Sequence, residues 1–449
     1  MAERLQSARG MRPLRIASLV AALTMLAPSL ARADGARVLT LAEVERAAER
    51  QPQVMVARAA TSIAQGQADQ ARAPLLPQIS ATAQYTRETG NYAANPVQKN
   101  LGTGAGTSTS LTTSFDYWQF DVGATQLLYD FGQTSQRYDA AEKTATAQSF
   151  AERTTRLQVM LGVRRAYFNA RAMKELVSVA DETLRDQDRH LIQVDGFVQQ
   201  GTQPPIALAQ QQAAVANAKV LLITAQNNYE TAKAQLNQAA GLGQDTEYDV
   251  ADETLPPIGD EDQSLQALAP RALAARPEMA TLEVQRQAQE ATVRAAKGAY
   301  GPTLSAAAGA SEIGIALGDM VPNWYGGLVM NVPIFQGGLT TAQVHTAEAG
   351  LQSVSAQRSV EELQVRLDVD SARLAVRAAK ATIPAADEAA TSAHEQLRLA
   401  EQRYAIGVGS IIELNDAQVA NTSAAAQAVQ ARYGLASARA QLLAALGRD

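Results

Sequence analysis

The longest proline-free stretches of the chain constrain its fold more than any other feature. Residues 133–199 contain no proline and only two glycines. One continuous helix over this range would be about 100 Å long at 1.5 Å per residue, which is too long to be buried inside a globule of 449 residues. An apolar residue recurs there at every seventh position, as in helices that pack side by side in coiled coils: Val163, Ala170, Val177, Leu184, Leu191 and Val198.

The same pattern occurs twice, which indicates an internal duplication. The second series lies 206 positions further along the chain and comprises Val369, Val376, Ile383, Ala390, Leu397 and Tyr404. The only two tryptophans, Trp118 and Trp324, are separated by the same 206 positions, whereas Pro77 and Pro302 are 225 positions apart. The second copy therefore lacks 19 residues between these markers. Loops tolerate such length changes, so a loop must lie there.

Each copy also contains two segments in which apolar and polar residues alternate. We predict strands near 78–88 and 114–129 in the first copy, and near 303–312 and 321–335 in the second. Strands of about ten residues with one apolar face and an aromatic residue near one end are typical of transmembrane barrels, although a half-buried soluble sheet gives a similar pattern. On the barrel interpretation, Trp118 and Trp324 lie at the membrane interface.

The predicted elements give a domain organisation. We expect a first repeat over 34–240, with a coiled-coil hairpin at 133–240, a linker over 241–264, and a second repeat over 265–449, with a hairpin at 338–447. The glycines at the strand-to-helix transitions, Gly132, Gly337 and Gly338, are expected to form the junction between a barrel and a helical tunnel. The narrowest barrels use about eight strands, so four strands per chain predict an oligomer.

The N-terminus and the composition limit the cellular location and the chemistry. Four arginines precede the apolar run "IASLVAALTMLAPSL", which ends in "ARA", so residues 1–33 are predicted to be a signal peptide. No later stretch is expected to cross a membrane as a helix. The chain has no cysteine and a formal net charge of −6, which excludes disulfides and thiol catalysis and disfavours nucleic acid as a partner.

No pattern in the sequence points to an enzyme. The three histidines are far apart, and we expect His190 and His394 to lie on solvated helix faces. The stretch "GTGAGT" at 102–107 is not followed by a helix with Lys and Ser or Thr, as a phosphate-binding loop would be. We therefore predict no catalytic, metal or cofactor site.

Taken together, these features resemble the TolC family of outer-membrane efflux and secretion channels. The most specific segments are "VPIFQGGLTTAQV", "RRAYFNARAMKELV" and "EQRYAIGVGSIIELNDAQ". The resemblance covers essentially the whole mature chain. It implies a homotrimer with a twelve-stranded barrel in the outer membrane, continued by a periplasmic α-helical barrel. It also implies an exit duct for drug efflux or type I protein secretion, docked to a periplasmic adaptor (a membrane fusion protein) and an inner-membrane pump.

The resemblance also assigns residues at the periplasmic entrance. Glu413 and Asp416 match an acidic pair that would form a ring of six carboxylates in a trimer, although Ser410 and Glu413 equally fit a helix capping box. The tip residues Gly201, Gly407 and Tyr404 match positions at the adaptor-binding end. In the family, the closed entrance is held by an Arg on this tip and by a Tyr that pairs with an Asp on the neighbouring tip. This chain has Tyr404, but Gly409 replaces the Arg and Ala207 replaces the Asp. The contacts that hold the entrance closed must therefore be built differently here, or be weaker.

A periplasmic coiled-coil adaptor or scaffold without a barrel is the alternative interpretation. An adaptor would have one helical hairpin flanked by compact β-domains. This chain instead has two equal copies, each with strands and a hairpin, which favours the channel.

Overall fold

The computed structural model describes residues 37–89, 114–243 and 248–448. The predicted signal peptide and the loop at 90–113 lie outside the described residues. The first half of the chain forms β1 (Arg37–Leu39), α1 (Leu41–Ala48), α2 (Pro52–Arg72), the short 3-10 helix η1 (Ala73–Leu75), β2 (Gln78–Thr89), β3 (Ser114–Tyr129), α4 (Gln133–Gln199) and α5 (Pro205–Ala240). The second half forms β4 (Tyr248–Val250), α6 (Leu265–Ala275), α7 (Pro277–Gly298), β5 (Thr303–Gly314), β6 (Val321–Asn331), α8 (Leu339–Ala405) and α9 (Ile411–Ala445).

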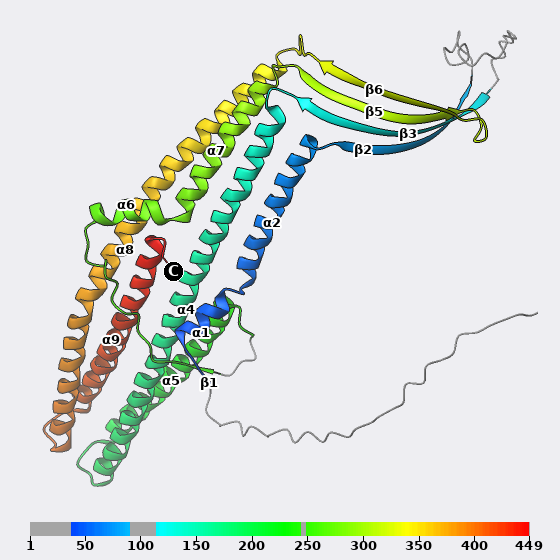
Figure 1. Ribbon diagram of the computed structural model, residues 1–449. Helices are drawn as coiled ribbons and strands as arrows, with labels where there is room; N and C mark the ends of the chain where they lie inside the picture. The colour runs from blue at the N-terminus through cyan, green and yellow to red at the C-terminus, as the bar shows by residue number, and fades with distance from the viewer. Residues whose placement is uncertain (1–36, 90–113, 244–247, 449) are drawn as a thin grey trace, which may run out of the picture.

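The molecule is elongated, with a curved sheet at one end and two helical tips at the other (Figure 1). Helices α2, α4, α7 and α8 lie side by side below the sheet, and α5 and α9 complete the two hairpins further down (Figure 1). Helix α4 covers the proline-free stretch 133–199, as predicted. Helix α8 also contains 67 residues, although Pro384 lies inside it. Every residue of the two seven-residue series is buried or half-buried, so these series are the packing seams of the hairpins.

The four long strands form one antiparallel sheet in the order β2-β3-β5-β6. Its register places Ala81 opposite Val122, Val122 opposite Ala310, and Ala310 opposite Trp324. The apolar residues predicted from the alternation therefore share one face of the sheet. That face is open, and Trp324 is 84% exposed. Strands β2 and β6 are the two edges of the sheet, and neither has a partner on its outer side within the described chain.

Strand β6 is shorter than predicted. It ends at Asn331, whereas the alternation suggested a strand up to residue 335. Pro333 has no backbone N–H to donate to a neighbouring strand, and β5 begins at Thr303, directly opposite Asn331. The segment 332–336 therefore continues without pairing until Gly337 and Gly338 turn the chain into α8 with positive φ angles of 60° and 83°.

No helix after the signal peptide was expected to be able to cross a membrane, and α5 differs from this expectation. Among the described residues, it is the one helix that is long and apolar enough, by length and composition alone, to cross a membrane. Its sequence is rich in alanine, and it packs along α4 as the second arm of the first hairpin. Small apolar residues of this kind allow two helices to approach closely.

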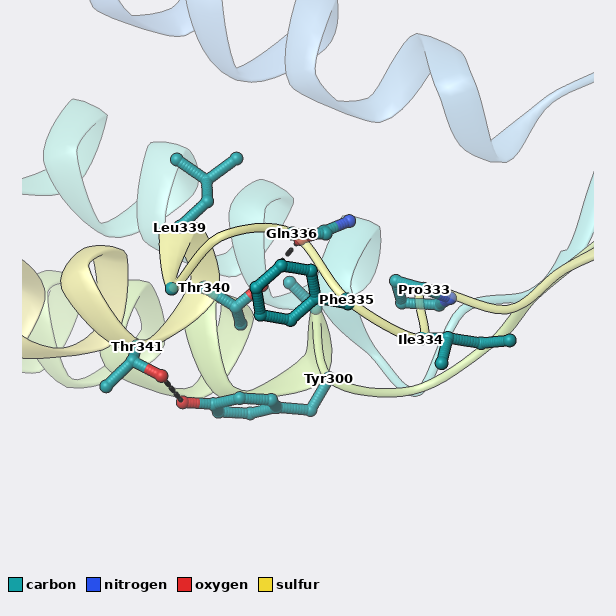
Figure 2. A pocket seen from close by; sticks show the side chains of 10 residues that line it. Tyr300, Pro333, Ile334, Phe335, Gln336, Leu339, Thr340 and Thr341 are labelled. Atoms are coloured by element: carbon teal, nitrogen blue, oxygen red, sulfur yellow. Dashed lines mark hydrogen bonds between the residues drawn. The ribbon is translucent and has the colours of Figure 1, made fainter.

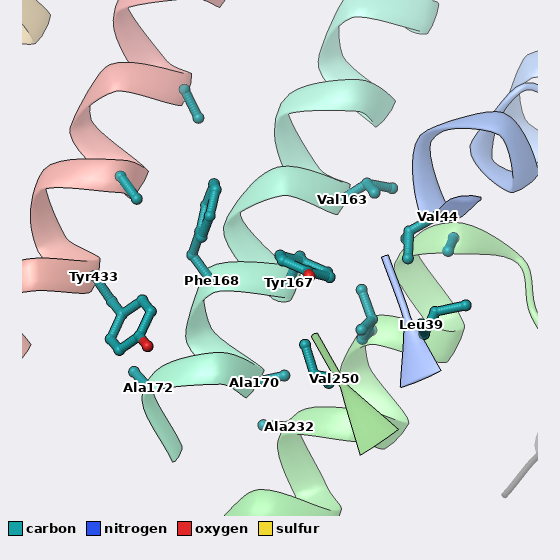
Figure 3. Packing of buried hydrophobic residues seen from close by; sticks show 14 of the residues in the cluster. Leu39, Val44, Val163, Tyr167, Phe168, Ala170, Ala172, Ala232, Val250 and Tyr433 are labelled. Atoms are coloured by element: carbon teal, nitrogen blue, oxygen red, sulfur yellow. The ribbon is translucent and has the colours of Figure 1, made fainter. Parts of the chain in front are cut away.

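The largest hydrophobic core lies at mid-length, where α1, α4, α5, α9 and the small parallel sheet β1–β4 meet (Figure 3). Tyr167 and Phe168 of α4 are at its centre, with their rings edge-to-face at 5.5 Å. The Tyr167 hydroxyl donates to the carbonyl of Ala251 or the carboxylate of Glu253, both at 3.2 Å. The linker between the repeats is thereby fixed to the first hairpin.

The same linker is fixed to the second hairpin by Glu261, a buried carboxylate. Arg439 of α9 donates to both of its oxygens at 2.8 and 3.0 Å, and Lys380 of α8 lies 2.7 Å away. Burial alone would raise the pKa of Glu261, but the hydrogen bonds from Arg439, Lys380 and the Ile258 N–H lower it to about 2. These ion pairs therefore stabilise the fold fully above the unfolded pKa near 4.5, and that contribution is lost as the pH falls from there towards 2.

We predict that Glu261→Gln lowers the free energy of unfolding by about 3 kcal/mol at pH 7, because it leaves two cations without their buried partner. Thermal unfolding of the detergent-purified protein, followed by helical circular dichroism, measures this effect. The variant should also lose part of the acid dependence between pH 4.5 and 2. The neighbouring Asp262→Asn is the control, since Asp262 pairs with Lys380 but is highly exposed. Equal destabilisation by both variants would contradict the prediction.

Candidate functional site at the helical tips

Both helical hairpins turn at a glycine in the left-handed conformation. In the first tip, Gly201 has φ +72°, its N–H donates to the Val198 carbonyl at 3.0 Å, and the Thr202 N–H donates to Phe197 at 3.0 Å. This pair of bonds is the Schellman arrangement, which satisfies the last carbonyls of a helix and requires a positive φ that glycine adopts without strain. The first tip therefore needs Gly201 for its backbone geometry.

The second tip repeats this arrangement around Gly407. Gly407 has φ +79°, its N–H donates to Tyr404 at 3.1 Å, and the Val408 N–H donates to Arg403 at 3.0 Å. Gly409 then passes close to the end of α8: a Cβ atom there would lie 2.9 Å from the Tyr404 nitrogen and 3.1 Å from the Arg403 Cβ. The absence of a side chain at position 409 is thus a steric requirement of this turn.

Glu413 has a cationic partner within its own tip. The Ser410 hydroxyl accepts from the Glu413 N–H at 3.1 Å, which is one half of the expected capping box. The Glu413 carboxylate instead lies 3.1 Å from Nε of Arg403, across the turn. Both side chains are about half exposed, so the ion pair is weak. It nevertheless places a positive charge beside one member of the predicted acidic pair.

Asp416 lies one turn further along α9 and is exposed. Within the residues that the structure describes, it has no ion-pair partner. The spacing of three positions puts Asp416 near Glu413 on the helix surface. The two carboxylates of the predicted pair are therefore unequal, because a cation compensates Glu413 but not Asp416.

Tyr404 does not fit the adaptor-contact role predicted for it, because its side chain is only 1% exposed. Its ring lies 5.8 Å from that of Phe197 on the first hairpin, within an apolar cluster that joins both tips. Ala207, at the position where the resemblance implies an Asp, is buried in the same cluster. A carboxylate at position 207 would be costly to bury there. Both departures from the family pattern, Gly409 and Ala207, thus have local steric or solvation causes.

A layer of buried polar side chains lies next to this cluster. His190 belongs to it, so the prediction that His190 lies on a solvated helix face is wrong. Its side chain is 5% exposed rather than solvated, and Nε2 lies 3.4 Å from the Glu401 carboxylate. Burial lowers the pKa of His190 and raises the pKa of Glu401. Gln211 and Gln418 are also buried in this layer, and each has a side-chain oxygen without a hydrogen-bond partner within the described chain. His394, by contrast, is exposed as expected.

The remaining predicted residues lie far from the tips. Gly132 and Gly338 are the N-caps of α4 and α8, both left-handed, so each long helix begins at a glycine as expected. At the other end of the molecule, the Trp118 ring lies 4.6 Å from that of Tyr85, and Trp324 is open to the surroundings. The structure brings neither group into contact with the tips.

Comparison with known proteins decides what this architecture is. The sequence profile described as "Outer membrane efflux protein" matches residues 44–242 and 268–448, one segment per repeat. The chain belongs to this family. It is 25% identical over 397 residues to the outer membrane protein TolC of Escherichia coli (strain K12), covering 84% of this chain and 76% of that protein. It is also 25% identical over 402 residues to the pyoverdine export outer membrane protein OpmQ of Pseudomonas putida, covering 87% and 82%.

Solved structures share the fold at lower identity. A crystal structure of CusC superposes with a TM-score of 0.78 at 19% identity, covering 91% of this chain and 92% of that one. The outer membrane protein VceC of Vibrio cholerae gives 0.77, also at 19% identity, covering 91% and 96%. The chain is thus an outer membrane efflux channel of the TolC type, a class that works in tripartite pumps. Family membership confirms a transport protein rather than an enzyme, and favours the channel over the adaptor alternative.

Arg403 is the residue that the sequence interpretation missed. It precedes Glu413 by ten positions, and no local pattern connects two residues on opposite sides of a turn. Only the Schellman arrangement at Gly407 and the close approach of Gly409 bring them together.

We predict that Gly409→Arg, which introduces the residue implied by the resemblance, disrupts the second tip instead of strengthening it. The new Cβ would lie too close to the backbone of α8, so a cost of about 1–3 kcal/mol is expected. Limited proteolysis at the tip measures the effect. Gly434→Ala on α9 is the control, because a Cβ there meets nothing within 4 Å. Unchanged protease resistance in Gly409→Arg would contradict the prediction.

Proposed function

We propose that three copies of this chain form a passive exit duct, with twelve strands in the outer membrane and a helical tunnel in the periplasm. The unpaired edges of β2 and β6 support this most directly. Unpaired backbone groups cannot remain exposed in lipid, so a membrane sheet must close on itself. Two copies would give eight strands, whose interior is just wide enough to be filled by side chains. A conducting barrel therefore requires at least three copies.

The entrance of this duct is formed by the second tips. The sequence alone suggested a ring of six equivalent carboxylates. The Arg403–Glu413 ion pair modifies that proposal, because each copy contributes one compensated carboxylate and one free carboxylate. We infer that Asp416 supplies most of the negative potential and that Arg403 reduces it. Rings of acidic side chains attract cations.

The partners in this proposal are a periplasmic adaptor at the tips and an inner-membrane pump that supplies the energy. Gly201 and Gly407 are exposed at the two turns and are available for adaptor contact, whereas Tyr404 is buried and packs inside the tip. Relatives named for their cargo export small molecules, namely pyoverdine and toluene. Small-molecule efflux is therefore our first proposal, and type I protein secretion is the second.

Single-channel currents in a planar bilayer test the entrance. We expect a trivalent cation such as hexamminecobalt, added from the periplasmic side, to block the native channel. Asp416→Ala should weaken the block by roughly tenfold, about 1.4 kcal/mol, while Glu413→Ala has a smaller effect. Arg403→Gln should strengthen the block, because it frees the Glu413 carboxylate.

The exposed acid Asp387, which lies further up α8, is the matched control, and Asp387→Asn should leave the block unchanged. Weaker block in Arg403→Gln, or equal effects of the Asp416 and Glu413 variants, would refute the proposed division of roles. Native mass spectrometry of the detergent-purified complex tests the assembly. A dimer or monomer that conducts would refute the trimer.

A further inference from the structure

The strand-to-helix junction of the second repeat carries an open apolar groove that the channel function does not use. Its walls are Tyr300 at the end of α7, the unpaired segment that contains Ile334 and Phe335, and Leu339 at the start of α8 (Figure 2). Ile334 is 93% exposed and Phe335 is 87% exposed. The groove has a volume of about 250 Å³. Neighbouring apolar side chains that are this exposed mark a surface that contacts lipid or another molecule.

Polarity increases along the surface between α7 and α8, away from the sheet. The first step is a hydroxyl pair, in which the Tyr300 and Thr341 oxygens lie 3.1 Å apart (Figure 2). The second step is an ion pair, in which Lys297 Nζ lies 2.8 Å from Glu348 Oε1. Lys297 precedes Tyr300 by one helical turn, and Glu348 follows Thr341 by two turns. Apolar side chains, then hydroxyl groups, then an ion pair therefore follow one another with increasing distance from the sheet.

This gradient begins where the apolar face of the sheet ends. Ile334 continues the alternation of Trp324, Leu328 and Met330, which lie on the open face of β6. Since the chain is an outer membrane protein, that face contacts lipid, and the groove lies at the boundary on the helical side. The polar layer of a bilayer leaflet is roughly 5–8 Å thick. One to two helical turns of α7 and α8 span this thickness.

We infer that the groove and the Lys297–Glu348 pair form a binding site for a phospholipid that has a phosphate and a primary amine, such as phosphatidylethanolamine. One acyl chain lies over Ile334, Phe335 and Leu339, and the ester region meets the two hydroxyls. The phosphate accepts from Lys297, and the ammonium donates to Glu348.

The charges of the site favour this lipid over others. The Lys297–Glu348 pair is about half exposed, so exchanging it for two contacts with a zwitterion costs little. Glu348 repels a headgroup that has only a phosphate, and a quaternary amine has no N–H to donate to it. Arg294, on the preceding turn of α7, is held by Gln136 and Asp139, which leaves Lys297 as the cation for the phosphate.

Native mass spectrometry of the purified, delipidated complex tests this inference. Dioleoyl phosphatidylethanolamine, phosphatidylglycerol and phosphatidylcholine are added in turn at equal concentration. We expect phosphatidylethanolamine to be retained most. Lys297→Gln/Glu348→Gln should reduce that preference about fivefold, near 1 kcal/mol, and Ile334→Ser/Phe335→Ser should reduce retention of all three lipids.

The matched control is Asp387→Asn/Arg432→Gln, which removes another exposed ion pair between two helices, far from the sheet. Equal retention of the three lipids, or a preference that survives the Lys297/Glu348 change, would overturn the inference. Occlusion of the groove by a neighbouring copy would appear as no retention and would overturn it as well. The inference rests on the membrane location of the sheet but not on the entrance. A protein that conducts without lipid preference would refute only this site, whereas a protein that neither binds lipid nor conducts would refute the channel.

Discussion

The backbone hydrogen bonds at the two edges of the sheet are the constraint on which the rest of the molecule depends. A four-stranded sheet in lipid leaves the N–H and C=O groups of β2 and β6 without partners unless another chain supplies them. One chain therefore folds as one sector of an oligomeric barrel. The long helices obey the same logic, because their seven-residue seams bury one side of each helix and leave other faces available to neighbouring copies.

Periodic features of the architecture could be predicted from the sequence, because each is encoded by residues close together in the chain. The proline-free stretch 133–199 predicted α4, and the duplication predicted the equally long α8. The alternation predicted which residues share a face of the sheet. The predicted end of β6 was wrong, and the cause is Pro333. Pro333 interrupts hydrogen bonding without interrupting the alternation of side chains, and the pattern reports only the latter.

Features of the tips that depend on contacts between different helices could not be predicted. Arg403 reaches Glu413 only because a left-handed glycine reverses the chain between them. His190 has a polar sequence neighbourhood typical of a solvated face, yet it is buried and lies beside Glu401 of α8. The resemblance implied that Glu413 and Asp416 are equivalent, whereas in the structure only Glu413 has a cation beside it. The difference arises from a single cation on the opposite side of the turn.

The contacts that join the two hairpins differ in polarity along the length of the molecule. At mid-length, the hairpins are joined by the large side chains around Tyr167 and Phe168. Near the tips, they are joined by the apolar cluster around Tyr404 and, beside it, by the layer that contains His190, Gln211 and Gln418, whose side chains keep unsatisfied polar atoms. Separating the hairpins there would let water hydrate these atoms, which offsets part of the lost packing. The buried polar groups therefore make separation of the hairpins near the tips less costly than it would be across an apolar contact of the same size.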